Sequence, residues 1–410
     1  MGLIEKVIDW IDERAHVKDI YRTQMVEYKV PKNLTFPYVF GVLALVTFAI
    51  QIISGMVLIL YYKPSIADAF DSATYTIMGE IPFGWLFRHI HAAGANFFMA
   101  IVYLHMFTGI YYNAYKRPRE LVWIVGWLIY FVLILTALSG YLLPWGQLSY
   151  WGFIVTTEIP GSLADAPILR DIFKAIAETI VLWMKGGYIV TDVTLGRVFG
   201  SHVLIYPLIL LALVGIHLYL VRAAGISNPE GIEYDKKKNP DKFVPFHPYV
   251  TLKEGAYVMW YLAVFFFFVF FHMGHFLPAD NFEPANPLKT PPHIAPEWYL
   301  LGFYEVFRSI PSKFWGFVAF NALLIFLLIL PLLDWSPLKS ARRRPLFFVA
   351  FVVFMISSMV LTILGTMEPT PMNAKLGLIF SFLVFGFFLS LPIISFIEYG
   401  WYKAKGGKQQ

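Results

Sequence analysis

The chain has 410 residues, of which 58% are apolar and only 14% are charged, a balance that water-soluble domains rarely reach. Its formal net charge of +5 is modest and gives no reason to expect a nucleic-acid partner. The absence of cysteine excludes disulfides, thioether-attached haem and thiolate-ligated iron–sulfur clusters in this chain. Any metal bound here must use other ligands.

Residues 1–35 mix charged and apolar side chains, which predicts an amphipathic helix on a membrane surface and not a secretory signal. Eight apolar segments follow, each long enough to cross about 30 Å of hydrocarbon as a helix. We expect these helices near 36–61, 84–111, 121–142, 198–222, 256–277, 316–335, 345–366 and 376–399. The predicted fold class is therefore an all-α integral membrane protein with eight transmembrane helices. A charged, Pro- and Asn-rich stretch divides it into a four-helix bundle over 36–225 and a four-helix domain over 226–410.

Basic residues indicate the orientation in the membrane. Of the 32 Lys and Arg, 22 lie in the two tails or in the second, fourth and sixth connections. Because positive charge favours the cytoplasmic side, we expect both termini to be cytoplasmic. On the opposite, outer side, the connections 143–197 and 278–315 are too long for simple turns, so functional residues are expected there.

Four of the ten histidines lie deep in apolar segments and form matched pairs. His91 and His105 are fourteen residues apart in the second segment, and His202 and His217 are fifteen apart in the fourth. On an α-helix these spacings advance about 21–22 Å and return to within about 40–60° of the same face. If the two helices face each other, His91 with His202 and His105 with His217 can each ligate an iron, so two bis-histidine haems are predicted.

A second pattern has the same period. Gly41 and Gly55 in the first segment, and Gly126 and Gly140 in the third, are again fourteen residues apart. Small residues are also common at ordinary helix contacts in membranes, but glycine lets a helix approach a flat macrocycle closely, and the shared period makes haem packing the better explanation. Arg88, one turn before His91, is placed to meet a haem propionate or to act as an interfacial anchor.

Several motifs resemble cytochrome b, the haem and quinone subunit of cytochrome bc complexes, over nearly the whole chain. The sequence Pro296-Glu297-Trp298-Tyr299 resembles the family's PEWY motif, and residues 140–152 resemble its segment after the third helix. The resemblance implies two non-covalent haem b groups held by the four histidines. It also implies an outer quinol-oxidising site formed by Tyr141, Gly152 and the PEWY residues, with Glu297 as proton acceptor and Tyr299 beside it.

The same resemblance implies partners and a location. The chain would oxidise quinol, pass one electron to a Rieske iron–sulfur protein and the other through the haems to a quinone-reducing site on the cytoplasmic face, and so contribute to a proton gradient. A c-type cytochrome, the lipid membrane and a second copy of the chain in a homodimer are the other expected partners. The expected location is the inner membrane of a bacterium.

Some positions depart from the mitochondrial pattern. The fifteen-residue spacing between His202 and His217, and Arg222 where the mitochondrial type has a quinone-contacting histidine, are similar to the photosynthetic branch. Glu254 replaces the usual aspartate, and with Arg222 it is our candidate for the quinone-reducing site. For the second ring nitrogens of the ligand histidines we expect hydrogen bonds to helix carbonyls or to hydroxyls such as those of Ser201 or Thr47.

Two other functions also fit part of the pattern. Intramembrane histidines without haem can relay protons in a transporter. A di-haem membrane anchor of another quinone oxidoreductase also uses bis-histidine haems, but such an anchor does not require the PEWY loop.

Overall fold

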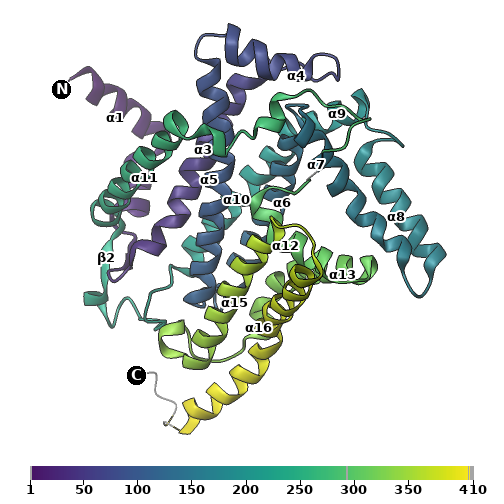
Figure 1. Cartoon of the computed structure of the whole chain (residues 1–410). Coiled ribbons are helices and arrows are strands. Elements are labelled where there is room, and N and C mark those ends of the chain that lie inside the picture. The colour runs from purple at the N-terminus through teal and green to yellow at the C-terminus, as the bar shows by residue number, and fades with distance from the viewer. Residues whose placement is uncertain (1, 292–293, 405, 407–410) are drawn as a thin grey trace.

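The computed structural model describes residues 2–291, 294–404 and 406 and is almost entirely helical. Figure 1 shows long, roughly aligned helices with shorter ones across their ends. The long apolar elements are α3 (Phe40–Ile59), α5 (Gly84–Tyr111), α6 (Glu120–Leu142), α9 (Asp192–Gly200) continued by α10 (Tyr206–Ala224), α11 (Thr251–Phe271), α15 (Pro345–Gly365) and α16 (Pro371–Ala404), with the shorter apolar helix α13 (Lys313–Leu328) beside them. The shorter elements are α1 (Leu3–Ala15), α2 (Val17–Tyr21), α4 (Ala69–Asp71), α7 (Gln147–Glu158), α8 (Arg170–Lys185), α12 (Trp298–Ser309), α14 (Leu330–Leu333), β1 (Lys29–Pro31) and β2 (Phe243–Pro245).

The predicted all-α membrane fold is confirmed. Within the described residues, seven helices are long and apolar enough to span a membrane, and α13 is a shorter apolar helix. The sixth predicted segment, 316–335, is not one helix, because α13 ends at Leu328 and α14 begins at Leu330. Pro331 explains the break, since its ring clashes with the carbonyl four residues earlier and it has no N–H to donate.

The fourth span contains an irregular turn. A π-helical turn over Ser201–Ile205 joins α9 to α10, and Pro207 stands at the start of α10. A proline cannot donate the regular α-helical hydrogen bond, so a local widening of the helix in the turn before it is a common response. His202 lies inside this turn.

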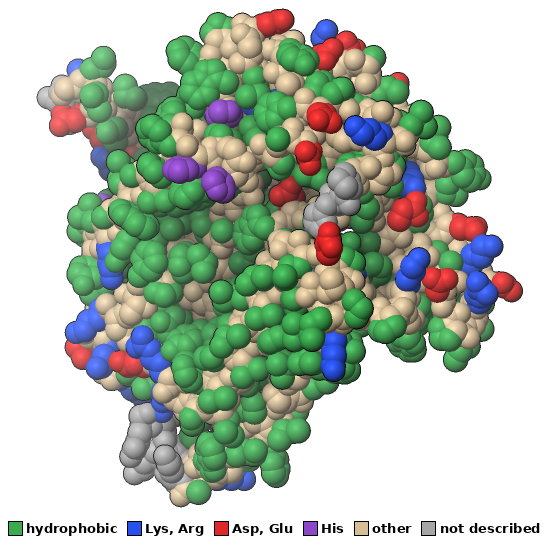
Figure 2. Space-filling model, in the orientation of Figure 1, with side chains coloured by type: hydrophobic (Ala, Val, Ile, Leu, Met, Phe, Trp, Pro, Cys, Tyr) green, Lys and Arg blue, Asp and Glu red, His purple; other side chains and the backbone are tan. Residues whose placement is uncertain are grey.

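The connections form two chemically different ends. We call the end formed by residues 60–83, 143–191, 272–291, 294–312 and 366–370 the long-loop end, and the end formed by 112–119, 225–245 and 329–344 the basic end. Figure 2 shows apolar side chains over much of the lower half of the visible face, and charged side chains mainly across its upper part, on the right and at the lower left. At the basic end, β1 and β2 pair antiparallel, which ties the N-terminal segment to the connection before α11.

The two predicted halves share their cores. One buried cluster joins Phe48, Phe98, Tyr130 and Leu210 of the first half with Tyr299 and Leu300 of α12. Another joins Ile110 and Tyr115 with residues of α12 to α16. The start of α12 therefore packs among the first four spanning helices, across the boundary at residue 225 that the sequence suggested.

A fully buried ionic cluster at the basic end also connects the halves. The guanidinium of Arg344 donates to both carboxylate oxygens of Asp334, at 2.7 and 2.8 Å, and to Glu398 Oε2 at 2.7 Å. Lys116 lies 2.9 Å from Asp334, and the Tyr115 hydroxyl also donates to that carboxylate. Although burial alone raises the pKa of Asp334, the Lys116 and Arg344 cations hold it well below its ordinary value.

Candidate functional site

The four histidines meet in pairs between α5 and the fourth span. The ring centres of His91 and His202 are 6.1 Å apart, and those of His105 and His217 are 6.4 Å apart. A metal–imidazole nitrogen bond is about 2 Å long, so two imidazoles that share one metal have ring centres about 6 Å apart. Both pairs therefore have the separation that a shared iron requires.

Hydrogen bonds fix the tautomers of His91 and His202. Nδ1 of His202 lies 2.9 Å from the Thr136 carbonyl oxygen, which only accepts, so this nitrogen must carry the proton. Nδ1 of His91 lies 3.0 Å from Ser54 Oγ, whose own proton is donated to the Ile50 carbonyl at 2.7 Å. In both rings Nε2 is therefore the unprotonated nitrogen, which is the form that ligates a metal.

The expected kind of partner, a helix carbonyl or hydroxyl, is confirmed for these two rings, but the two residues that we named, Ser201 and Thr47, were wrong. The Thr47 hydroxyl donates to the Leu43 carbonyl and contacts the Tyr261 hydroxyl, both at 2.7 Å. Within the described residues, no hydrogen bond joins Ser201 to a histidine. Ser54 has the same local signal as Thr47, a hydroxyl within an apolar helix, so only the rotation of α3 against α5 distinguishes them.

The π-helical turn accounts for the unequal histidine spacing. In a regular α-helix, a residue fifteen positions after another lies about 60° round the axis from it, whereas one fourteen positions after lies about 40° round in the other direction. The turn over Ser201–Ile205 contains His202 and lies at the start of the interval that leads to His217, where it takes up one additional residue. The fourth span can thus present both histidines to α5 despite the longer spacing.

Each of the four glycines faces one of the four histidines. A Cβ atom on Gly41 would lie 3.3 Å from His105 Cε1, and one on Gly55 would lie 3.2 Å from His91 Cε1. The same atom on Gly126 would lie 3.2 Å from the His217 ring, and on Gly140 only 2.4 Å from the His202 ring. The glycines therefore leave room for the imidazole rings themselves, which the sequence pattern alone had assigned to the macrocycle.

Arg88 has an unused donor. Its Nη1 donates to the Ala73 carbonyl at 2.7 Å and lies 2.9 Å from Met78 Sδ, whereas Nη2 is buried and has no hydrogen-bond partner in the structure. A buried, unpaired guanidinium nitrogen is costly, and a carboxylate is its natural partner. A haem propionate fits this requirement.

The donor set as a whole suits haem and not a bare metal ion. Among the described residues, no group of three or more His, Asp or Glu side chains converges on one point. Two histidines per site would hold an iron only if a macrocycle supplied its remaining ligands. The paired rings, the glycines beside them and the unused Arg88 donor all fit such a group.

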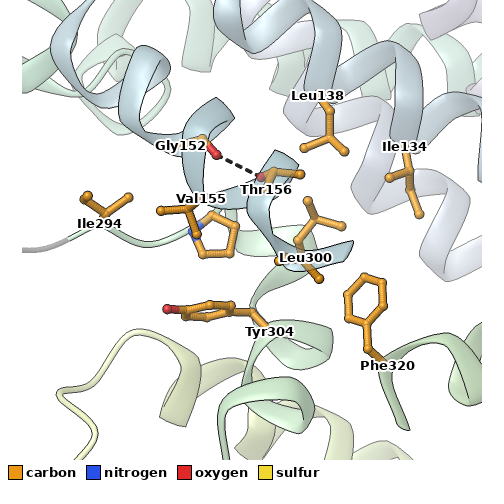
Figure 3. Close-up of a pocket in the computed structure, with 11 residues that line it drawn as sticks. Ile134, Leu138, Gly152, Val155, Thr156, Ile294, Leu300, Tyr304 and Phe320 are labelled. Carbon is orange, nitrogen blue, oxygen red and sulfur yellow. Dashed lines mark hydrogen bonds between the residues drawn. The ribbon is translucent and has the colours of Figure 1, made fainter. Parts of the chain in front are cut away.

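A narrow apolar cavity of about 60 Å³ lies at the long-loop end. Figure 3 shows Ile134 and Leu138 of α6, Thr156 of α7, and Tyr304 and Phe320 around it. Gly152 and Pro296, both predicted site residues, also line the cavity. The two segments that carry the predicted quinol site therefore do meet, although 144 positions separate these two residues in the sequence.

Glu297 is positioned by a hydrogen-bonded chain. Its carboxyl pairs with the Tyr141 hydroxyl, and burial raises the pKa of Glu297 even though that hydrogen bond opposes the shift. Asn281 Nδ2 lies 3.4 Å from the Tyr141 hydroxyl, while its Oδ1 accepts from the Ser149 backbone N–H at 2.7 Å. Because the amide nitrogen only donates, the Tyr141 proton is free to point at Glu297. Asn281 carried no signal in the sequence that set it apart from other loop residues.

The other two PEWY residues pack against the helix bundle. Tyr299 is buried, and burial together with the nearby Glu297 carboxyl raises the pKa of its hydroxyl well above the ordinary value. Trp298 donates from Nε1 to Asn96 Oδ1 on α5 at 2.8 Å. The motif therefore lines the cavity with Pro296 and places the Tyr299 hydroxyl near Glu297.

Arg222 and Glu254, the predicted quinone-reducing residues, both lie toward the basic end. Arg222 Nη1 donates to the Gln24 carbonyl at 2.7 Å, and its guanidinium lies over the Tyr28 ring at 4.1 Å. Glu254 is partly buried in the first turn of α11, and no described hydrogen bond or ion pair involves its carboxyl. The structure does not join the two side chains directly.

Comparison with known proteins assigns the family. Residues 25–225 match the family described as cytochrome b/b6/petB, and residues 284–385 match its C-terminal counterpart, cytochrome b(C-terminal)/b6/petD. A cytochrome b from Allochromatium vinosum is 40% identical over 407 residues and covers 95% of both chains. The chain belongs to the cytochrome b family. Members of this family bind haem b, which agrees with the paired histidines, and neither a haem-free transporter nor an unrelated di-haem anchor fits this assignment.

Two further comparisons extend the assignment. A cytochrome b from Rhodospirillum rubrum is 39% identical over 396 residues, covering 96% of this chain and 94% of that one. A solved structure described as a hyperthermophilic respiratory Complex III contains a chain with 92% identity and a TM-score of 0.94, matching 96% of this chain and all of that one. The chain is a cytochrome b of this type, the multi-pass electron-transfer subunit of Complex III, the quinol:cytochrome c oxidoreductase.

Proposed function

We propose that the chain oxidises quinol in the cavity at the long-loop end and reduces quinone at the basic end. His91 with His202 would hold one haem b near the long-loop end, and His105 with His217 would hold the other near the basic end. Gly41, Gly55, Gly126 and Gly140 give the four imidazoles room, and Arg88 offers a donor to a propionate. When bound, the haems supply one-electron carriers at two depths of a low-dielectric bundle.

The cavity residues make the first proton transfer possible. A general base must lie within hydrogen-bonding reach of the proton it accepts and must be ionised at the working pH. Glu297 is placed for this role, because it follows Pro296 of the cavity lining and the hydrogen bond from the Tyr141 hydroxyl favours its ionised form. The apolar lining around Pro296 and Gly152 suits the ring and tail of a quinol and keeps bulk water away. This contact between Glu297 and Tyr141 beside an apolar cavity is the observation that carries the proposal.

The two electrons of quinol then take different routes. One leaves the protein to a Rieske iron–sulfur protein and from there to a c-type cytochrome, and the other crosses the bundle to the basic end. Moving one charge against a membrane potential costs about 2.3 kcal/mol per 100 mV, which is the energy that such an arrangement conserves. Arg222 and Glu254 are our candidates for the carbonyl contact and proton delivery at the quinone-reducing site.

The orientation follows from charge. The basic end carries Lys236-Lys237-Lys238 and Arg342-Arg343-Arg344, so we propose that it faces the cytoplasm and that both termini lie on that side. The long-loop end then faces outward, where the Rieske protein and the c-type cytochrome would dock. We also propose a bacterial inner-membrane location, a homodimeric core, and separate bundle and C-terminal units on either side of residue 225.

Two measurements test this function. Reduced-minus-oxidised absorption spectra of the purified protein should show two haem b per chain, and His202→Ala should remove one while leaving the other. In the assembled complex, Glu297→Gln should slow quinol oxidation strongly while both haem b spectra remain. Unchanged quinol oxidation in the Glu297→Gln complex would remove Glu297 from the mechanism.

A further inference from the structure

The helix that carries two of the ligand histidines also contacts the quinol loop. Trp298 Nε1 donates to Asn96 Oδ1 at 2.8 Å, and the Tyr103 hydroxyl donates to the Tyr299 carbonyl oxygen at 2.5 Å. Asn96 and Tyr103 both belong to α5 and lie between His91 and His105 in the sequence. Two adjacent residues of the PEWY motif are therefore attached to two separate turns of one helix.

The spacing of these contacts on α5 is regular. Asn96 and Tyr103 are seven residues apart, which places them on one face of the helix about 10 Å apart along its axis. Relative to His91, both lie about 120–140° round the helix, so they do not share the ligand face. The Trp298 ring centre lies 6.2 Å from that of Tyr103, so the indole occupies the space between the two attachment points. One face of α5 thus holds ligand histidines while another holds the quinol loop.

Both attachments are themselves fixed in direction. Asn96 Nδ2 donates to the Ala92 carbonyl at 3.0 Å, so its Oδ1 must face Trp298. The Tyr103 hydroxyl lies 2.9 Å from the Tyr130 hydroxyl of α6. Since the single proton of Tyr103 is directed at the Tyr299 carbonyl, Tyr130 must be the donor in that pair. Tyr130 is almost completely buried, with 1% of its surface exposed, so it has no water to bond instead.

We propose that Asn96 and Tyr103, the latter held by Tyr130, are positioning residues that set the place of Glu297 in the quinol-oxidising site. Glu297 caps α12 and immediately precedes Trp298, and its carbonyl accepts from the Leu300 N–H at 2.8 Å, so fixing residues 298 and 299 fixes its backbone. None of these three positioning residues lines the apolar cavity or reaches the Glu297 carboxyl within the described contacts. They act through the loop, and the inference rests on the function proposed above.

The chain offers variants that separate positioning from stability. Tyr103→Phe removes the hydroxyl that reaches Tyr299, but it also leaves the buried Tyr130 hydroxyl without an acceptor, which destabilises the protein. The double variant Tyr103→Phe/Tyr130→Phe removes both hydroxyls, and no buried donor then lacks a partner. Tyr219→Phe, at a tyrosine of α10 that is 71% exposed, is the control for a simple loss of a hydroxyl.

The experiment uses the assembled complex and quinol prepared from the quinone that co-purifies with it. We expect Tyr103→Phe to lower both the thermal midpoint and kcat for quinol oxidation, the latter by about tenfold, since small displacements of a catalytic group have effects of up to about a hundredfold. In the double variant the thermal midpoint should return toward that of the unmodified protein, while kcat stays low. Recovery of kcat together with stability would overturn the proposal.

A double-mutant cycle of Tyr103→Phe with Glu297→Gln gives a second, independent test of the proposal. If Tyr103 acts by placing Glu297, then Tyr103→Phe should reduce kcat much less in the Glu297→Gln background than in the unmodified protein. The same fold loss in both backgrounds would refute positioning. Failure of the proposed function itself has a different signature, because Glu297→Gln alone would then leave quinol oxidation unchanged.

Discussion

Replacing Gly140 with alanine should selectively weaken the haem site near the long-loop end. The added Cβ would lie 2.4 Å from His202 Cε1 and 2.9 Å from Nδ1, about 1 Å inside an ordinary carbon contact. The ring cannot turn away freely, because its Nδ1 is hydrogen bonded to the Thr136 carbonyl and its other nitrogen is needed by the iron. Overpacking of this kind typically costs about 1–3 kcal/mol, so haem affinity at this site should fall by about 5- to 150-fold.

Gly126→Ala is the matched control for this prediction. Its Cβ would lie 3.2 Å from His217 Cε1, so the neighbouring ring needs to move only a few tenths of an ångström. Haem content per chain, measured by reduced-minus-oxidised spectra during dilution, should fall toward one haem in Gly140→Ala and stay near two in Gly126→Ala. Equal retention of both haems in the two variants would show that the glycine at position 140 is not required by the His202 ring.

Three further predictions address the proton acceptor, the ionic cluster and the irregular turn. Burial raises the pKa of Glu297, so the rate of quinol oxidation should decline as the pH falls through this raised pKa and the base becomes protonated. Glu297→Gln should abolish this decline on the acidic side of the pH–rate profile. If the decline is unchanged in that variant, it belongs to another group. Arg344→Met leaves the buried carboxylates of Asp334 and Glu398 without their shared cation and should destabilise the protein by about 3–5 kcal/mol. This loss should appear as a lower thermal midpoint. An unaltered midpoint would mean that the cluster reorganises. Deleting Leu204 should let the π-helical turn close to a regular α-helical turn, and the protein should retain both haems. As a control, deleting Phe98 from the regular helix α5 should cause the loss of at least one haem. Loss of haem in the Leu204 deletion would contradict the role given to the turn.

Much of this protein was determined by local sequence patterns. A helix of 3.6 residues per turn converts sequence spacing directly into face and depth, so the fourteen-residue intervals of histidine and glycine are enough by themselves to predict two haem levels. Apolar length alone predicted the spanning helices, with the exception of α13, where Pro331 ends the helix early. The PEWY motif and residues 140–152 identified the family and the loop that carries Glu297.

Contacts between distant segments were decided only by the tertiary structure. Periodicity says that Thr47 and Ser54 both lie in an apolar helix, but only the rotation of α3 against α5 makes Ser54 the partner of His91. Sequence periodicity likewise gives no reason for Asn281 to contact Tyr141, or for the Tyr103 hydroxyl to reach the Tyr299 carbonyl, 196 positions away. The fifteen-residue interval in the fourth span had an ambiguous meaning until the π-helical turn showed where the additional residue is taken up. These features depend on how rigid helices rotate and settle against one another, and that is fixed by the packing of all their side chains together and not by the pattern along any one of them.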